Sequence, residues 1–219
     1  DDPAHSALTF HLVGNLTDSR LDEASGIQAL AADRFVVHND EGGSLYVVDA
    51  AGLNLGQIRI QGAKHKDWED LALVPGPDGR LVVVGDTGDN DSDRKKVRLY
   101  FVKEPLADSQ SGEYPQSSDV VHSLELRYED GPRDVESIAY DPHSGMILLL
   151  SKRDQPPRLY GVPLTEALAS ETVTAGFLAE VPVFRPPTRR DILASPKRGL
   201  WVSQPTAMDI SPDGRLAAV

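Results

Sequence analysis

Cysteine is absent from this chain of 219 residues, and so are long apolar runs. Without thiols the chain has neither a disulfide framework nor a thiolate site. No stretch approaches the roughly 18 consecutive apolar residues of a membrane-spanning helix, so the sequence predicts no membrane span. The G-x-S-x-G, P-loop and H-E-x-x-H patterns are also missing, which excludes the commonest nucleophile, nucleotide and zinc-protease classes.

Positive charge is scarce as well. Lys and Arg number 22 against 34 Asp and Glu, giving a net charge of -12. Such a surplus repels a phosphate backbone, so nucleic acid is not expected as a partner. The surplus carboxylates suit hard cations or basic partners, and they also keep a secreted protein soluble. The chain starts at Asp1 without Met, as a mature exported protein or a trimmed chain would, and we expect a secreted or periplasmic protein.

An internal repeat organises the chain. Residues 67–73 (DWEDLAL) and 134–140 (DVESIAY) each lead through a turn containing Gly and Asp to a second apolar run. Short runs rich in Val, Ile, Leu and Tyr predict strands, and only residues 164–170 read as a helix. The repeating units lie at about residues 23–60, 67–128, 134–184 and 204–219.

These units predict an all-β fold, a single β-propeller domain, because four-stranded units of about 40 to 50 residues are typical of propeller blades. A β-sandwich or barrel with similar hairpins is the alternative. The last unit is incomplete, which predicts a longer natural chain. Residues 8–13 read as a lone strand that could complete the last blade.

Polar residues converge at one end of the predicted blades, because the start of the first strand and the end of the second lie at the same end. This reasoning places His38 and Asp134 on the rim, together with Lys152, Arg153 and Asp154. The candidate metal ligands there are Asp67, Glu69, Asp86, Asp89, Asn90 and Glu136.

The loop at residues 85–94 (GDTGDNDSDR) is the sharpest local motif, and its oxygens could gather round Ca²⁺. It is not an EF-hand, because a loop starting at Asp89 would have Arg94 in place of Gly and Tyr100 in place of Glu. A solvated acidic turn is the alternative.

Glu69 and Glu136 stand at the start of inner strands, where a charge needs a partner. That partner could be a cation, a metal or backbone N–H groups, and a structural hydrogen bond to a neighbouring blade remains open. His38, with Glu69 and Glu136, is a candidate catalytic group, and an ordinary surface histidine is the alternative.

The succession of residues 38–42 (HNDEG), 67–72 (DWEDLA) and 85–90 (GDTGDN), closing on Glu104 and Pro105, resembles a family of uncharacterised bacterial secreted propeller proteins. More distantly, residues 135–145 are similar to esterase-like phytase-type propellers, and the architecture resembles gluconolactonase- and regucalcin-like proteins. These resemblances imply six blades, export, and often a divalent metal at the top of the channel. They do not imply one activity.

Two functions follow from this reading. The first is a binding or scaffold propeller whose acidic rim, holding Ca²⁺, grips a small molecule, a carbohydrate or a protein. The alternative is a metal-dependent hydrolase in which the ion polarises an ester, lactone or phosphoester and His38 or a carboxylate acts as base. Whether the chain is an enzyme stays open at this point.

Overall fold

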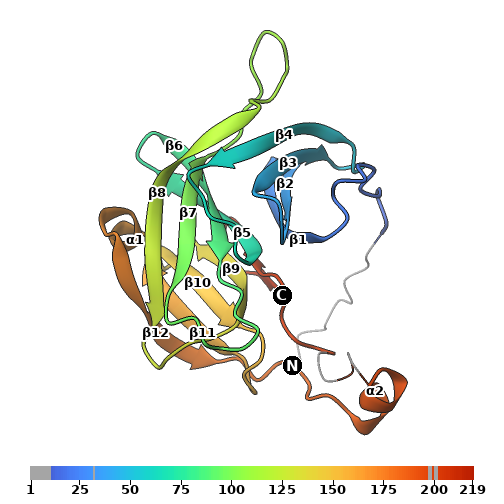
Figure 1. Cartoon of the computed structure of the whole chain (residues 1–219), viewed down its shortest axis with the longest axis vertical. Helices are drawn as coiled ribbons and strands as arrows, with labels where there is room; N and C mark the ends of the chain where they lie inside the picture. The colour runs from blue at the N-terminus through green and yellow to red at the C-terminus, as the bar shows by residue number, and fades with distance from the viewer. Residues whose placement is uncertain (1–10, 32, 197–198, 200–201) are drawn as a thin grey trace, which may run out of the picture.

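The computed structural model describes residues 11–31, 33–196, 199 and 202–219 (Figure 1). This part of the chain is built mainly of β-strands, which confirms the all-β class. Within the described ranges, none of the helices is both long and apolar enough to cross a membrane.

Twelve of the strands form three successive groups of four. The first unit contains β1 (Ala24–Ala31), β2 (Arg34–Asn39), β3 (Ser44–Asp49) and β4 (Asn54–Gln61). The second contains β5 (Trp68–Gly76), β6 (Gly79–Asp86), β7 (Val97–Lys103) and β8 (Ser117–Tyr128). The third contains β9 (Val135–Asp141), β10 (Met146–Ser151), β11 (Arg158–Pro163) and β12 (Thr172–Glu180). A short pair follows, β13 (Asp209–Ile210) and β14 (Ala217–Ala218).

Consecutive strands of each unit pair in antiparallel fashion. The turn between β5 and β6 needs Gly79, whose φ of 122° lies in the region that side chains disfavour. Because the strands run up and down, the start of β5 and the end of β6 meet at one end of the unit, where Trp68 pairs with Asp86.

The units meet through their first and last strands. Among the first strands, β5 lies between β1 and β9, and β13 lies against β9. The last strands pair in parallel at staggered positions, with Arg59 of β4 opposite Ser117 of β8, and Glu125 of β8 opposite Thr172 of β12. The result is one twelve-stranded mixed sheet that runs from β1 to β9 and does not close on itself within the described residues (Figure 1).

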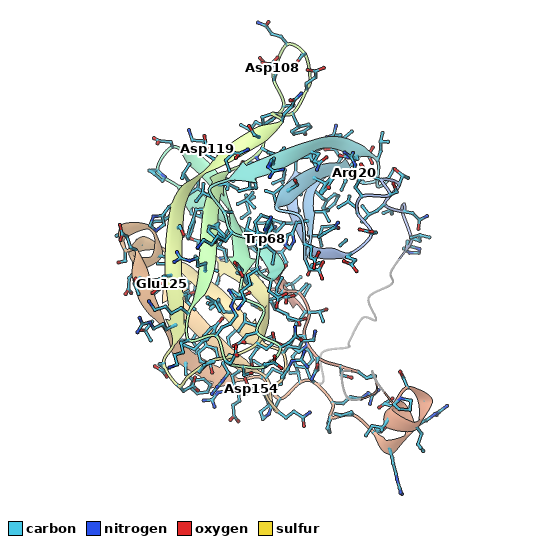
Figure 2. All side chains as sticks on the ribbon, in the orientation of Figure 1. Arg20, Trp68, Asp108, Asp119, Glu125 and Asp154 are labelled. Carbon is cyan, nitrogen blue, oxygen red and sulfur yellow. The ribbon has the colours of Figure 1, made fainter. Side chains whose placement is uncertain are left out.

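The core fills the two spaces between units. In β6, Val82 and Val84 pack in the cluster shared with the first unit, whereas Leu81 and Val83 pack in the cluster shared with the third. Because side chains alternate between the faces of a strand, a sheet buried on both faces has continuous apolar runs instead of alternating ones. Trp68, which Figure 2 labels inside the molecule, is fully buried in the cluster between the first two units.

Two short helices lie after β11. The expected helix at residues 164–170 is confirmed as α1 (Leu164–Ala169). A second helix, α2 (Arg189–Ala194), was not expected and is fixed by a capping box between Thr188 and Asp191. The lone strand expected at residues 8–13 lies partly outside the described residues, and residues 11–13 are not in a strand.

Candidate functional site

The repeated Asp-x-Glu pattern brings carboxylates together between the second and third units. Glu69 is the second residue of β5 and Glu136 is the second residue of β9, and these two strands are neighbours. Asp134 directly precedes β9. One oxygen from each of Glu69, Asp134 and Glu136 lies within 4.8 Å of the others, and all three residues are buried. We call these three residues the carboxylate triad.

The spacing of the triad fits a hard divalent cation. Ca²⁺ binds oxygen ligands at about 2.3–2.6 Å, so two ligands of one ion lie at most about 5 Å apart. The distances within the triad fall inside this limit. Carboxylates at these distances repel one another unless protons or cations neutralise them.

Two members of the triad already have cationic partners. The Lys152 ammonium pairs with both carboxylate oxygens of Glu136, and the Arg153 Nε donates to Asp134 Oδ2 at 2.6 Å. Asp134 Oδ1 accepts from the backbone N–H of Asp89 at 2.8 Å. Asp134 and Glu136 are therefore held in place by salt bridges and hydrogen bonds.

Glu69 is the exception. It is 8% exposed, and its carboxylate accepts no hydrogen bond from any described residue. Burial, together with the neighbouring charges of Glu136, Asp67 and Asp134 and against the opposing effect of Lys152, raises the pKa of Glu69 to about 9. Burial also raises the pKa of Glu136, which Lys152 counteracts. Glu69 is thus a buried carboxyl group that needs a proton or a cation.

The other expected ligands lie at the same end but do not join the triad. Asp86 pairs with Arg94 at 2.8 Å and accepts from the backbone N–H of Asp67 at 3.2 Å. Asp89 accepts from the backbone N–H groups of Asp93 and Arg94 at 3.0 and 2.9 Å. These bonds close the loop after β6.

Asn90 lies within this loop, and Asp67 directly precedes β5. Asn90 is exposed and its side-chain oxygen accepts from Arg153. Asp67 is half-buried, and burial raises its pKa. The carboxylate of Asp67 lies beside Gly88, as does Oε1 of Glu69, so Asp67 borders the triad.

The prediction that His38 lies in a rim loop was wrong, because the residue lies in the interior. Strand β2 continues through Asn39, so the His38 side chain points into the protein and is fully buried. Its Nδ1 lies 2.7 Å from the carbonyl oxygen of Asn39, and its ring meets the edge of Trp68 with centroids 5.7 Å apart. Burial lowers the pKa of His38 to about 4. A buried neutral imidazole is not positioned to exchange protons with a ligand at the rim.

Asp134 is the residue that sequence reasoning placed on the rim but left out of the ligand set. Its signal was present, since Asp134-x-Glu136 repeats the Asp67-x-Glu69 spacing at the start of an inner strand. Gly88 was also missed. A Cβ at this position would overlap with Oε1 of Glu69 and with the carboxylate of Asp67.

If the triad binds Ca²⁺, Gly88→Ala is expected to weaken that binding at least tenfold while leaving the fold intact. The added methyl group meets the ends of two flexible side chains, so it displaces the Glu69 and Asp67 carboxylates instead of the backbone. Titration calorimetry with Ca²⁺ measures the affinity. Gly176→Ala is the control, because its Cβ would meet only Glu129 at an ordinary 3.9 Å. Equal affinity of Gly88→Ala and the unchanged protein would show that these carboxylates do not bind the ion.

Comparison with known proteins assigns no family. No protein-family model matches the chain, and no curated protein matches it. Among solved structures the chain is similar to one described as Kuenenia stuttgartiensis hydrazine synthase, with a TM-score of 0.40 and 13% sequence identity. The similarity covers 97% of this chain and 43% of that one, so the chain spans less than half of that structure's length.

Proposed function

We propose that this chain is part of a β-propeller, six-bladed when complete, that serves outside the cytoplasm as a binding or scaffold module with a Ca²⁺ site on its channel rim. Three successive four-stranded antiparallel units whose first strands lie side by side support the propeller. The motif resemblance supports export and the divalent metal. The partner would be a small molecule, a carbohydrate or a protein that meets the acidic rim.

The main support for the cation site is the burial of Glu69 without a hydrogen-bond donor among the described residues. A buried carboxylate without a hydrogen-bond donor costs several kcal/mol when ionised, unless a cation compensates it. Glu69 lies beside Asp134 and Glu136, which supply further oxygens within ligand distance. Oxygen ligands alone, without His or Cys, favour a hard cation such as Ca²⁺ over zinc.

Calcium is expected to raise the melting temperature, and a chelator to lower it. An ion that binds only the folded state adds about 2.7 kcal/mol at a hundredfold excess over its dissociation constant. For a domain of this size that corresponds to roughly 5–10 °C. Thermal unfolding followed by circular dichroism, with CaCl₂ or EDTA, measures the shift.

Three variants test whether the shift in melting temperature with calcium depends on the triad. Glu136→Gln should abolish it, because it removes one of the three triad carboxylates. Glu125→Gln on β8 should retain it, because Glu125 also pairs with a lysine, Lys96, but lies on an outer strand. Asp154→Ala should retain it too, since Asp154 pairs with Arg133 outside the triad. An unchanged melting curve of the original protein in CaCl₂ and EDTA would refute the cation site.

A metal-dependent hydrolase is the second candidate, and one observation favours it. Glu69 has a strongly raised pKa and lies beside Glu136, which Lys152 holds in a salt bridge, and a carboxyl group that stays protonated at neutral pH can act as a general acid. Because His38 is buried, a carboxylate would have to act as the base. Calcium-dependent turnover of an ester, lactone or phosphoester that Glu69→Gln abolishes would establish this alternative.

A further inference from the structure

Lys152 contacts one of the three triad carboxylates, that of Glu136. It directly follows β10, and its backbone N–H donates to the carbonyl oxygen of Asp134 at 2.9 Å. This bond fixes the start of its side chain beside the triad. The ammonium group then pairs with both carboxylate oxygens of Glu136. The pair is largely shielded from water, with side-chain exposures of 17% for Lys152 and 9% for Glu136.

We propose that Lys152 is a built-in competitor that a divalent cation must displace from Glu136, so that Lys152 sets both the affinity of the site and its preference for divalent over monovalent ions. The inference rests on the proposed cation site. The ammonium group contacts both Glu136 oxygens, one of which the metal ion would need as a ligand, and the two cations repel each other at contact distance. Occupation by one therefore excludes the other.

The charge count explains the preference for divalent ions. With all three triad carboxylates ionised, as binding of an ion requires, they carry -3, and Lys152 and Arg153 add +2, leaving -1. A divalent ion that replaces Lys152 brings the total to 0, since Arg153 stays with Asp134. A monovalent ion in the same place restores only -1 and must first break the Lys152–Glu136 pair. Sodium and potassium therefore gain nothing from the exchange.

A neighbouring pocket can receive the displaced ammonium group of Lys152. Lys152 also lines a pocket of roughly 260 Å³ together with Asp154, Phe184 and Gln204. Lysine carries its charge on a flexible four-carbon stem, so it can turn from Glu136 towards this opening and towards Asp154. Arg153 is more strongly held, because it contacts Asp134 and Asn90 at once. Lys152 is therefore the cation that can move.

Lys152→Met tests the competition. It removes the ammonium group and keeps a chain of similar length, so the Ca²⁺ dissociation constant should fall at least tenfold. Lys152→Arg retains a positive charge, and its affinity should stay close to that of the original protein. Lys96→Met is the matched control, because it breaks the Lys96–Glu125 pair on the outer face and should change nothing. Titration calorimetry with Ca²⁺, in KCl and in NaCl, measures all four proteins.

The outcomes separate this inference from the cation site itself. Equal Ca²⁺ affinity of Lys152→Met and the original protein would overturn the inference and leave the site standing. Binding only by Lys152→Met would support the competition and remove calcium binding as a function of the original protein. No binding by either would overturn both. If Lys152→Met does not fold, Lys152→Gln takes its place, because its amide still donates to Glu136.

Discussion

Glu69→Gln is expected to make the calcium-free protein more stable above pH 7 and to remove its response to calcium. The pKa of Glu69 is raised from 4.5 to about 9 in the folded protein, mainly by burial. Between these values the folded chain holds one proton more than the unfolded chain, so the free energy of unfolding falls by about 1.4 kcal/mol per pH unit. Glutamine does not ionise in this pH range, so the fall in the free energy of unfolding with pH should be absent from Glu69→Gln.

The sign follows from the direction of the shift. A raised pKa contributes stability that is fully present below pH 4.5 and lost as the pH rises towards 9. Asp70 has the same sign, but its pKa is raised only from 3.8 to about 7. From pH 7 to pH 9 most of the decline therefore comes from Glu69, because Asp70 completes its titration early in this interval. Urea unfolding in EDTA at pH 7, 8 and 9 should show a declining free energy for the original protein and a flatter profile for Glu69→Gln.

Calcium should reverse the decline in the free energy of unfolding of the original protein. An ion at the proposed site would bind the ionised Glu69 carboxylate and offset the cost of burying its charge. Glu125→Gln is the control. Lys96 and two arginines lower the pKa of Glu125, so its titration ends well below pH 7. Parallel pH profiles for the original protein and Glu69→Gln would mean that Glu69 finds a partner in solution and that the cation site has lost its main support.

Much of the strand pattern could be predicted from the sequence, because local signals specify it. Turns such as residues 76–79 separate the apolar runs, and the continuous run at 81–84 reflects a sheet buried on both faces. The meeting of Glu69 and Glu136 also followed from their equal places at the starts of inner strands. Helix α2 was not predicted, because its capping box has Asp191 in the place where the usual sequence signature has Glu or Gln.

His38 was misplaced, and the partners of Asp86 and Asp89 were not predicted, because these contacts are not encoded by local pattern. His38 is buried because β2 extends to Asn39, and an Asn-Asp sequence after an apolar run is more typical of a turn. Asp86 pairs with Arg94 only because the intervening loop folds back on itself. Asp89 accepts from the backbone N–H groups of Asp93 and Arg94, four and five residues further along the chain.

Asp70 went unnoticed for the same reason, although it connects three units. Its Oδ2 accepts from the backbone N–H of Ile138 on β9 at 2.8 Å and from that of Met208, just before β13, at 3.1 Å. Its Oδ1 accepts from Leu71 at 2.9 Å. Asp70 is 1% exposed, and burial raises its pKa to about 7 although these three hydrogen bonds lower it. The Asp70 carboxylate is stabilised at this buried position because it accepts hydrogen bonds from three N–H groups that need an acceptor.

Asp70→Ala is expected to lower the free energy of unfolding by roughly 3 kcal/mol or more at pH 7, the largest loss expected of any single variant proposed for this chain. The substitution leaves three buried N–H groups without an acceptor, each worth about 1–3 kcal/mol, and the relief of burying a charge offsets only part of this. Asp70→Asn should cost less. Its side-chain oxygen can take the place of Oδ2 and keep both bonds between units, losing only the bond to Leu71.

Urea unfolding measures the loss, and hydrogen exchange at Met208 and Ile138 identifies its origin. Both amides should exchange faster in Asp70→Ala than in Asp70→Asn, because only the alanine variant releases them. Asp141→Ala is the matched control: Asp141 accepts from His143 and from the amide and hydroxyl of Ser144, but in an exposed turn where water replaces it. Its cost should stay near 1 kcal/mol. If Asp70→Ala costs no more than Asp141→Ala, water reaches these amides in solution and Asp70 does not hold the units together.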